Sequence, residues 1–288
     1  MSVEKILVVA HKIFDDSNLP NGYNVTKVGN NRFALPGGWS DCDGDDNISH
    51  ENPWYCELTA QYWAWKNLPE DMDVIGLVHY RRYFMSYKVD SRCFWDDVLS
   101  IEEARNILHN YKMIIPFKTA KRSGGSILYR NRIMNEHDKH WVIIYQIMRE
   151  KYPDYLKSFE KVIFGKKQVW FNMFIASKKI FDLYSQWIFG VLKEYDTAIK
   201  SIGENRVPRV DGFLSELLLL VWVDKNIAVK EIKYLDVKNI EANEKLTYSS
   251  NFTNKICKML YSNYNLLKLY KNMKASFDVI YRTIFEGL

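Results

Sequence analysis

The chain has 288 residues, which is enough for one large domain or two small ones around a sizeable core. Apolar residues make up 47% and charged residues 26% of the sequence, and this ordinary balance excludes an intrinsically disordered chain. The net charge is +5, and six basic against two acidic residues between Tyr248 and Leu288 supply +4 of it, so the rest of the chain lacks the basic surplus of a nucleic-acid-binding protein.

The first part of the chain predicts alternating strands and helices. In order, the expected elements are a buried strand at 5–14, a strand at 23–29, a loop dense in turn residues at 35–53, a helix at 54–70, a strand at 73–84, a helix at 100–111 and a strand at 112–117. Pro53 suits the first turn of the helix that follows it. Ser100 and Glu103 have the spacing of a capping box.

The second part continues the alternation. The expected elements are a basic loop at 120–132, helical segments over 136–164 with a break at Pro153, a strand at 168–177, helices at 179–199 and 209–226, and a closing strand at 228–237. This order predicts an α/β fold with a mixed, mainly parallel sheet flanked by helices. We expect one domain over residues 1–240 and a helical C-terminal extension over 241–288.

The cysteines and apolar runs bear on the cellular compartment. The four cysteines have the spacing of neither a zinc site nor a disulfide framework, which favours a reducing, cytoplasmic environment. The N-terminal stretch has too few apolar residues for a signal peptide, and the longest apolar run, at 217–223, is far shorter than the ~20 residues of a membrane span. We therefore expect a cytoplasmic protein, either soluble or peripheral on a membrane.

The stretch DVIGLVHYRRYF at 73–84 combines a buried strand with a cationic end. In a parallel sheet, ligands bind at the carboxyl ends of the strands. This rule places four groups along one candidate edge: His11, the tetrad His79–Arg82, Lys118 and Asn172. We expect the strand to be buried over its first half and to end at a cleft.

The two arginines of this stretch carry planar guanidinium groups, which can bind phosphate oxygens bidentately. Arg81 and Arg82 would then hold a diphosphate and neutralise the charge on a leaving nucleoside diphosphate. The alternative is an ion pair with a carboxylate of the acidic loop. Three roles remain open for His79: a base, a phosphate donor or a structural histidine.

Carboxylates occur at two further places. The loop DCDGDDNIS carries four aspartates that miss the EF-hand register, so a cation site, a solvated loop and a loop that binds sugar hydroxyls all remain open. Asp211 and Glu216 lie near the start of an apolar helix, where a half-desolvated carboxylate suits a general base. The alternative is that Asp211 caps the helix and Glu216 forms a salt bridge at the core edge.

Four segments of the sequence resemble the DUF4422 family of bacterial capsule and O-antigen gene clusters. They are DGDDNISHENPWYCELTAQYWAWKN, DVIGLVHYRRYF, FNMFIASKKIFDLYSQWIF and GFLSE. The resemblance covers about residues 3–240 and implies a glycosyltransferase with a GT-A-like α/β fold. Some members are similar to galactofuranosyltransferases, which makes UDP-galactofuranose a candidate donor.

The family pattern matches this chain at defined positions. They are Asp45, Asn47–Ser49, Asn52, Glu57, Tyr62, Trp63, Trp65–Asn67, His79–Phe84, Asn172–Ile175 and Gly212–Glu216. The family usually carries a non-acidic residue at Asp211, which favours Glu216 as the base. The loop at 118–141 matches more loosely, with His137 at a position that is often histidine.

The resemblance and the residues together give an expected site. It comprises Glu216, Asp211 and His79 as catalytic residues, Arg81, Arg82 and His11 on the donor diphosphate, and Asp41, Asp43, Asp45, Asn47, Asn172 and His137 on the donor or acceptor sugar. Trp63 or Trp65 would shape the site, unless both belong to the core.

Many GT-A enzymes end the corresponding strand in Asp-x-Asp, which binds the metal that bridges the donor diphosphate. Here that end reads HYRR. We expect Arg81 and Arg82 to replace the metal, so that metal-independent transfer is favoured over a Mn²⁺ or Mg²⁺ cofactor.

The expected reaction moves a hexosyl unit from a UDP-hexose to a hydroxyl of a growing surface polysaccharide on a lipid-linked oligosaccharide. The alternative is a non-catalytic carbohydrate-binding or scaffold protein of the polysaccharide assembly complex. Residues 255–285 place apolar and basic side chains broadly on opposite helical sides, which suits the anionic inner leaflet of the membrane. The alternative for this segment is a helix packed on the domain.

Overall fold

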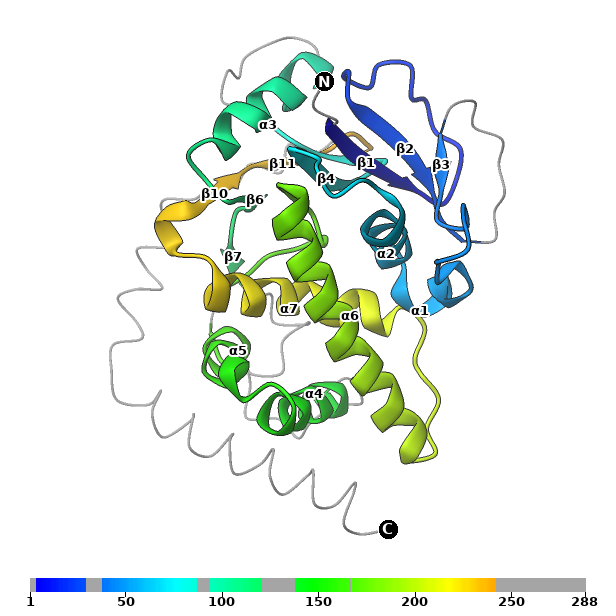
Figure 1. The fold of residues 1–288 in the computed structure, drawn as a ribbon, viewed down its shortest axis with the longest axis vertical. Helices are drawn as coiled ribbons and strands as arrows, with labels where there is room; N and C mark the ends of the chain where they lie inside the picture. Colours follow the sequence, from blue (N-terminus) through cyan, green and yellow to red (C-terminus); the bar gives the residue numbers. More distant parts are fainter. Residues whose placement is uncertain (1–3, 30–37, 87–93, 121–137, 166, 242–288) are drawn as a thin grey trace.

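The computed structural model of the protein describes residues 4–29, 38–86, 94–120, 138–165 and 167–241 (Figure 1). Most of the expected C-terminal extension, from residue 242 on, and the candidate site residue His137 lie outside the described residues.

The fold is built on a mixed sheet. The described strands of its main path run in the order β10-β6-β9-β4-β1-β2-β3. Their bounds are β1 (Glu4–Ala10), β2 (Tyr23–Lys27), β3 (Trp39–Ser40), β4 (Val74–His79), β6 (Met113–Pro116), β9 (Phe174–Ala176) and β10 (Ile232–Leu235). All neighbours pair in parallel except β9, which lies antiparallel between β4 and β6. The predicted mixed, mainly parallel sheet is confirmed.

Helices cover both faces of the sheet (Figure 1). The α-helices are α1 (Asn52–Tyr55), α2 (Leu58–Asn67), α3 (Ile101–Leu108), α4 (Asp138–Glu150), α5 (Leu156–Ile163), α6 (Lys178–Ser201) and α7 (Val210–Asn226). Short 3₁₀ helices are η1 (Ser49–Glu51), η2 (Phe94–Asp97), η3 (Pro153–Tyr155) and η4 (Val229–Glu231). In the described part of the chain, no helix is long and apolar enough to cross a membrane.

Alternate residues of the central strands point into two different cores, as the pleat of a strand requires. Leu7 and Val9 of β1 belong to the larger core, which also contains residues of α2, α4, α5, α6 and α7. Ile6 and Val8 face the other side, in a smaller core that includes Ala104 of α3. Because both faces are covered, these strands are apolar on both sides, which explains the continuous apolar runs of the sequence.

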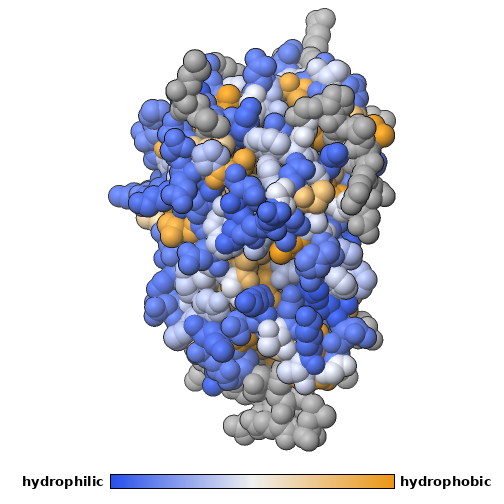
Figure 2. Space-filling model, turned by 45° about the vertical axis from the view of Figure 1, so that its right-hand side comes forward, coloured by the Kyte–Doolittle hydropathy of each residue, from blue (hydrophilic) through white to orange (hydrophobic). Residues whose placement is uncertain are grey.

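The outer face drawn in Figure 2 is largely hydrophilic, with small hydrophobic patches.

Several local predictions are confirmed. Pro53 lies in the first turn of α1, Ser100 and Glu103 form the capping box of α3, and the helical segment breaks before Pro153. The predicted cap of α7 is wrong, because the N-cap is Arg209 with φ +65° and not Asp211.

Several predicted elements differ from the structure in their bounds; the closing strand predicted at 228–237, for example, begins with η4 and is a strand only from β10 on. The helix at 54–70 is divided at Cys56, whose φ is +52°. The strand at 168–177 is shortened to β9, which is preceded by two residues of positive φ. Its first residue, Gln168, belongs to β8 (Lys167–Gln168), which pairs with β7 (Thr119–Ala120). The stretch 73–84 is a hairpin, because β5 (Arg82–Phe84) turns back antiparallel to β4 and then pairs with β11 (Val237–Asn239).

Candidate active site

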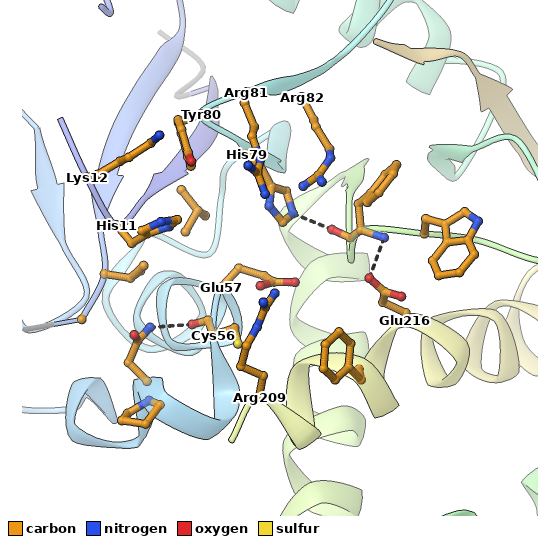
Figure 3. A pocket seen from close by; sticks show the side chains of 18 residues that line it. His11, Lys12, Cys56, Glu57, His79, Tyr80, Arg81, Arg82, Arg209 and Glu216 are labelled. Carbon is orange, nitrogen blue, oxygen red and sulfur yellow. Dashed lines mark hydrogen bonds between the residues drawn. The ribbon is translucent and has the colours of Figure 1, made fainter. Parts of the chain in front are cut away.

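A cleft of about 880 Å³ lies at the carboxyl ends of β1 and β4 (Figure 3). The residues that line it are Val9, His11, Lys12, Val28, Gly29, Asn52, Pro53, Cys56, Glu57, His79, Tyr80, Arg81, Arg82, Trp170, Phe171, Arg209, Phe213 and Glu216. Its position follows the rule that ligand sites of α/β sheets form beyond the carboxyl ends of the strands.

The hairpin after β4 explains why a buried strand ends in charged residues. The backbone N–H of Tyr80 donates to the carbonyl of Val9 over 3.1 Å, so β1 and β4 remain side by side up to the cleft. Tyr80 and Tyr83 are buried, and the Tyr83 hydroxyl donates to the Tyr80 carbonyl. The two tyrosines thus anchor the turn in the smaller core while the intervening arginines reach the cleft, as the sequence predicted.

One peptide unit connects the end of β4 with α7. His79 Nε2 lies 2.6 Å from the carbonyl oxygen of Phe171, and the backbone N–H of Phe171 donates to Glu216 Oε1 over 3.1 Å (Figure 3). Because a carbonyl only accepts, Nε2 of His79 carries the proton. Burial lowers the pKa of His79, so the neutral tautomer with an accepting Nδ1 predominates at neutral pH.

Backbone strain is concentrated at this cleft. Among the described residues, the non-glycine residues with positive φ are Cys56, Phe171, Asn172 and Arg209, and three of them line the cleft while Asn172 adjoins it. Such conformations cost about 1–3 kcal/mol each and persist where the surrounding structure fixes them. Asn172 is fixed by its Nδ2, which donates to Glu57 Oε1 over 2.7 Å and to the Gly212 carbonyl over 2.8 Å.

Cationic side chains outnumber carboxylates in the cleft. Lys12, Arg81, Arg82 and Arg209 line it together with Glu57 and Glu216. The guanidinium of Arg82 lies 4.3 Å from the centre of the Phe171 ring, which holds it in place by a cation–π contact. A concave site with this balance attracts an anionic ligand.

At the rim, a carboxylate already bridges two of these cations. Glu241 Oε1 lies 3.3 Å from Lys12 Nζ, and Oε2 lies 3.3 Å from Arg81 Nη1. All three side chains are substantially exposed, so these ion pairs contribute little to stability. The arrangement shows that Lys12 and Arg81 can bind oxygens of one anion together.

The two carboxylates of the cleft have different surroundings. Burial raises the pKa of Glu216 to about 7, against the opposing effects of the Phe171 N–H and of Arg82 and Arg209. A carboxyl group with a pKa near neutrality suits proton transfer at physiological pH. Glu57 points toward the centre of the cleft, with His79 and Arg209 on either side (Figure 3).

The structure brings together five of the predicted site residues. His11, His79, Arg81, Arg82 and Glu216 all line the cleft. Asn172 adjoins it through its hydrogen bond to Glu57.

The acidic loop does not reach the cleft, so Asp41, Asp43, Asp45 and Asn47 are not among the lining residues. The loop is instead bound to α2 and to itself. Asp41 is buried and accepts a hydrogen bond from Thr59, Asp43 accepts from the Ser40 N–H, and Asn47 donates to the Gly44 carbonyl. These polar groups hold the turn in place, because α2 offers hydroxyl and indole donors that the sequence pattern does not reveal.

Asp211 is also outside the cleft lining. It is fully buried, and its Oδ2 lies 3.5 Å from Arg206 Nη1, in a cluster with Glu51 and Asp196. Burial raises the pKa of Asp211 to about 8. This cluster anchors the loop before α7, so the structure favours a structural role for Asp211 over that of a base.

Other candidates are placed elsewhere. Trp63 is buried in the larger core, Trp65 packs against the same core, and Lys118 lies near the Tyr234 ring away from the cleft lining. Sequence reasoning missed Lys12, Glu57 and Arg209 as site residues. Glu57 carried a family match, but only the tertiary fold shows that it faces the cleft.

Comparisons with known proteins agree with this architecture. The family model described as Domain of unknown function (DUF4422) matches residues 5–227. A solved structure described as the apo form of WbbM, a bifunctional glycosyltransferase, is similar with a TM-score of 0.67 and 25% sequence identity, over 84% of this chain and 46% of that one. The chain thus spans about half the length of the protein it resembles, and the predicted α/β fold class is confirmed. No curated protein matches the sequence.

Substitutions at Asn172 test whether the left-handed backbone is enforced. Asn172→Ala removes the hydrogen bonds to Glu57 and Gly212 and should lower the free energy of unfolding by about 2–4 kcal/mol. Asn172→Gly should cost about 1 kcal/mol less, because glycine accepts positive φ. Asn106, an exposed residue within α3, provides the control. There the glycine variant should lose more unfolding free energy than the alanine variant, since glycine is a poorer helix former than alanine. Urea unfolding measures all four variants, and equal losses for the two Asn172 variants would contradict the strained conformation.

The raised pKa of Glu216 predicts a pH dependence of stability. The pKa is about 7 in the folded state against 4.5 for the unfolded chain, so between these values the folded state binds more protons. Stability should therefore fall as the pH rises through this window, by an amount on the order of 3 kcal/mol, and then level off. Asp211, with a pKa of about 8, should also lower the stability of the folded state as the pH rises. Urea midpoints from about pH 5 to about pH 8 should decline less in Glu216→Gln than in the wild type, and parallel curves would show that Glu216 is not perturbed.

Proposed function

The chain belongs to the DUF4422 family, and we propose that it is a glycosyltransferase that moves a hexosyl unit from a UDP-sugar to a hydroxyl of a growing capsular polysaccharide or O-antigen. The observation that carries the proposal is the cleft at the ends of β1 and β4, which four cationic side chains line together with two carboxylates. The similarity to a solved glycosyltransferase supports it.

The cations would bind the donor diphosphate. Arg81 and Arg82 follow β4 directly and offer planar donors for phosphate oxygens, and Lys12 lies beside Arg81 across Glu241. As the bond from sugar to phosphate breaks, negative charge grows on the departing diphosphate. Fixed positive charges at this place stabilise that charge and lower the barrier.

Glu216 would be the general base. The attacking acceptor hydroxyl must lose its proton as its oxygen bonds to the anomeric carbon. Glu216 lines the cleft, its Oε1 is oriented by the Phe171 N–H, and its pKa of about 7 suits the uptake of that proton. His79 would act through Phe171 as a positioning residue, because its Nε2 is engaged by the Phe171 carbonyl.

The identities of the donor and the acceptor are proposed from the family resemblance and from the charge of the cleft, not from contacts with individual residues. The family resemblance supplies UDP-galactofuranose as the candidate donor. The candidate acceptor is a lipid-linked oligosaccharide, which would lie at the membrane face that the C-terminal segment suits. A sugar nucleotide carries the charges that the cleft complements.

A divalent cation, which many GT-A enzymes use, has few ligands at this site. In the described residues, no group of three or more His, Cys, Asp or Glu side chains is placed to hold a metal ion. The carboxylates of the cleft are interspersed with arginines, whose charge opposes cation binding. We therefore assign the stabilisation of the diphosphate to Arg81 and Arg82.

Nucleotide binding tests this assignment. Arg81→Ala and Arg82→Ala each remove charge-assisted hydrogen bonds worth about 1.5–3 kcal/mol, so the Kd of UDP should rise roughly 10–100-fold in each variant. Isothermal titration in excess EDTA measures the affinity without divalent metal. Lys118→Ala is the matched control, because it removes a cation at the same sheet edge outside the cleft lining.

Wild-type affinity for UDP should persist in EDTA. Binding that returns only with manganese would contradict the replacement of the metal by arginines. If neither UDP nor any UDP-sugar binds, the alternative of a non-catalytic carbohydrate-binding protein gains the support that the transferase loses.

We further propose that the protein is cytoplasmic and binds the inner face of the membrane through its basic C-terminal segment. The support is the composition of the sequence over 255–285, where six basic residues stand against one acidic residue among apolar ones. Replacing Lys268, Lys271 and Lys274 together by Glu should abolish sedimentation with vesicles of phosphatidylglycerol, while replacing three surface lysines of the domain, Lys151, Lys161 and Lys193, should leave it unchanged. Equal binding of the tail variant and the wild type would disprove this localisation.

A further inference from the structure

We propose that Glu57 is a second catalytic carboxylate, which contacts the transferring sugar and stabilises the positive charge that develops on its anomeric carbon. The proposal rests on the proposed transferase function and deepens it by giving each carboxylate of the cleft a separate task. Glu216 takes the proton of the acceptor, whereas Glu57 acts by its charge.

The position of Glu57 is set by the break between α1 and α2. Glu57 is the N-cap of α2, and the residue before it, Cys56, has φ +52° and ψ −127°. If α1 continued into α2 as one helix, Cys56 would have helical dihedral angles, and the backbone would enter Glu57 from another direction. The left-handed turn at Cys56 thus leads into a carboxylate that points to the centre of the cleft (Figure 3).

One dipeptide orients both carboxylates. The Phe171 N–H donates to Glu216 Oε1 over 3.1 Å, and the side-chain amide of the next residue, Asn172, donates to Glu57 Oε1 over 2.7 Å. Asn172 is only 2% exposed, and the same amide nitrogen also donates to the Gly212 carbonyl at the start of α7. The two carboxylates are therefore held at a fixed separation by adjacent residues of a strained segment. A carboxylate that only paired with a neighbouring arginine would not require this support.

The charges around Glu57 suit an electrostatic task. Arg82 and His79 are close enough to feel its field, and Arg209 lies beside it (Figure 3). The two arginines carry positive charge throughout the physiological pH range and attract the negative charge of a carboxylate. Across the cleft, burial raises the pKa of Glu216 to about 7. Two carboxylates in such unequal surroundings can divide the roles of fixed charge and proton acceptor.

The step balances without a bond to Glu57. The bond between the anomeric carbon and the diphosphate oxygen breaks, and its electron pair leaves with the diphosphate toward Arg81 and Arg82. The acceptor oxygen forms the new bond to the anomeric carbon, and its proton moves to Glu216. Glu57 neither gains nor loses a proton, and its negative charge faces the carbon while that carbon is electron-deficient.

An anionic acceptor separates the two roles. Azide attacks without losing a proton, so it needs no base. Glu57→Gln and Glu216→Gln should each lower UDP release in the presence of the hydroxyl acceptor by about 10²–10³-fold. Azide should restore UDP release and form a glycosyl azide in Glu216→Gln, and should restore neither in Glu57→Gln. The donors to be screened with the wild type are UDP-galactofuranose, UDP-galactose and UDP-glucose.

Controls distinguish a catalytic from a structural effect. Glu70→Gln neutralises an exposed carboxylate just beyond α2 and should leave UDP release unchanged. The Kd of UDP should remain within about threefold of the wild-type value in Glu57→Gln, because a fixed charge facing the sugar carbon contributes little to diphosphate binding. Glu57→Asp keeps the charge and should retain more transfer than Glu57→Gln, which provides a second comparison if the amide variant folds poorly.

The outcomes separate the two proposals. Azide rescue of Glu57→Gln would make Glu57 a base and overturn the inference, as would full activity of Glu57→Gln or equal activity of the Asp and Gln variants, while the transferase function would stand. If the wild type releases UDP from none of the donors, with or without acceptor or azide, the proposed function and this inference fail together.

Discussion

The segment Phe171–Asn172 is the constraint on which the cleft depends. It lies just before β9, in the middle of the sheet, and both residues have positive φ. Through four hydrogen bonds it connects the end of β4 at His79, α2 at Glu57, and α7 at Gly212 and Glu216. Because the hydrogen bonds come from both backbone and side chain, the strained conformation is held from three directions. The strained backbone costs free energy, and in return the side chains that line the cleft are held in a fixed arrangement.

The parallel pairing of β1 with β4 supplies the other half of the site. It brings His11 and Lys12 beside the hairpin that carries Arg81 and Arg82, and the antiparallel return of β5 keeps that hairpin short. Tyr80 and Tyr83 bury the turn, so the arginines are extended from a rigid base. Arginine charge placed in this way can stabilise a leaving diphosphate without the rearrangement of solvent that an exposed group would require.

Much of the fold was predictable from the sequence, because strand length, apolar periodicity and capping residues are local signals. The order of elements, the capping box at Ser100 and the cleft at the end of β4 followed from such signals. The divided helix at Cys56 and the shortened strand before Phe174 did not, because positive φ at a non-glycine residue is imposed by tertiary contacts. For the same reason Glu57 was not predicted as a site residue. The direction of its side chain depends on the backbone turn at Cys56, and its hydrogen-bond partner Asn172 is distant in sequence.

The acidic loop shows the opposite limitation. Its aspartates suggested sugar or cation binding, but Asp41 is buried against Thr59 and the loop folds onto α2. Composition alone does not distinguish carboxylates that bind a ligand from those that accept hydrogen bonds from their own fold. Asp211 is a similar case, since its carboxyl group faces Arg206 and not the cleft.

The most direct test of the account is an experimental structure of the protein with bound UDP in the presence of EDTA. We expect the diphosphate to lie in the cleft at the ends of β1 and β4. Its oxygens should be within hydrogen-bonding distance of Arg81 and Arg82, and its terminal phosphate should face Glu57 and Glu216. A diphosphate bound at another place, or one held in this cleft with both arginines turned away, would contradict it.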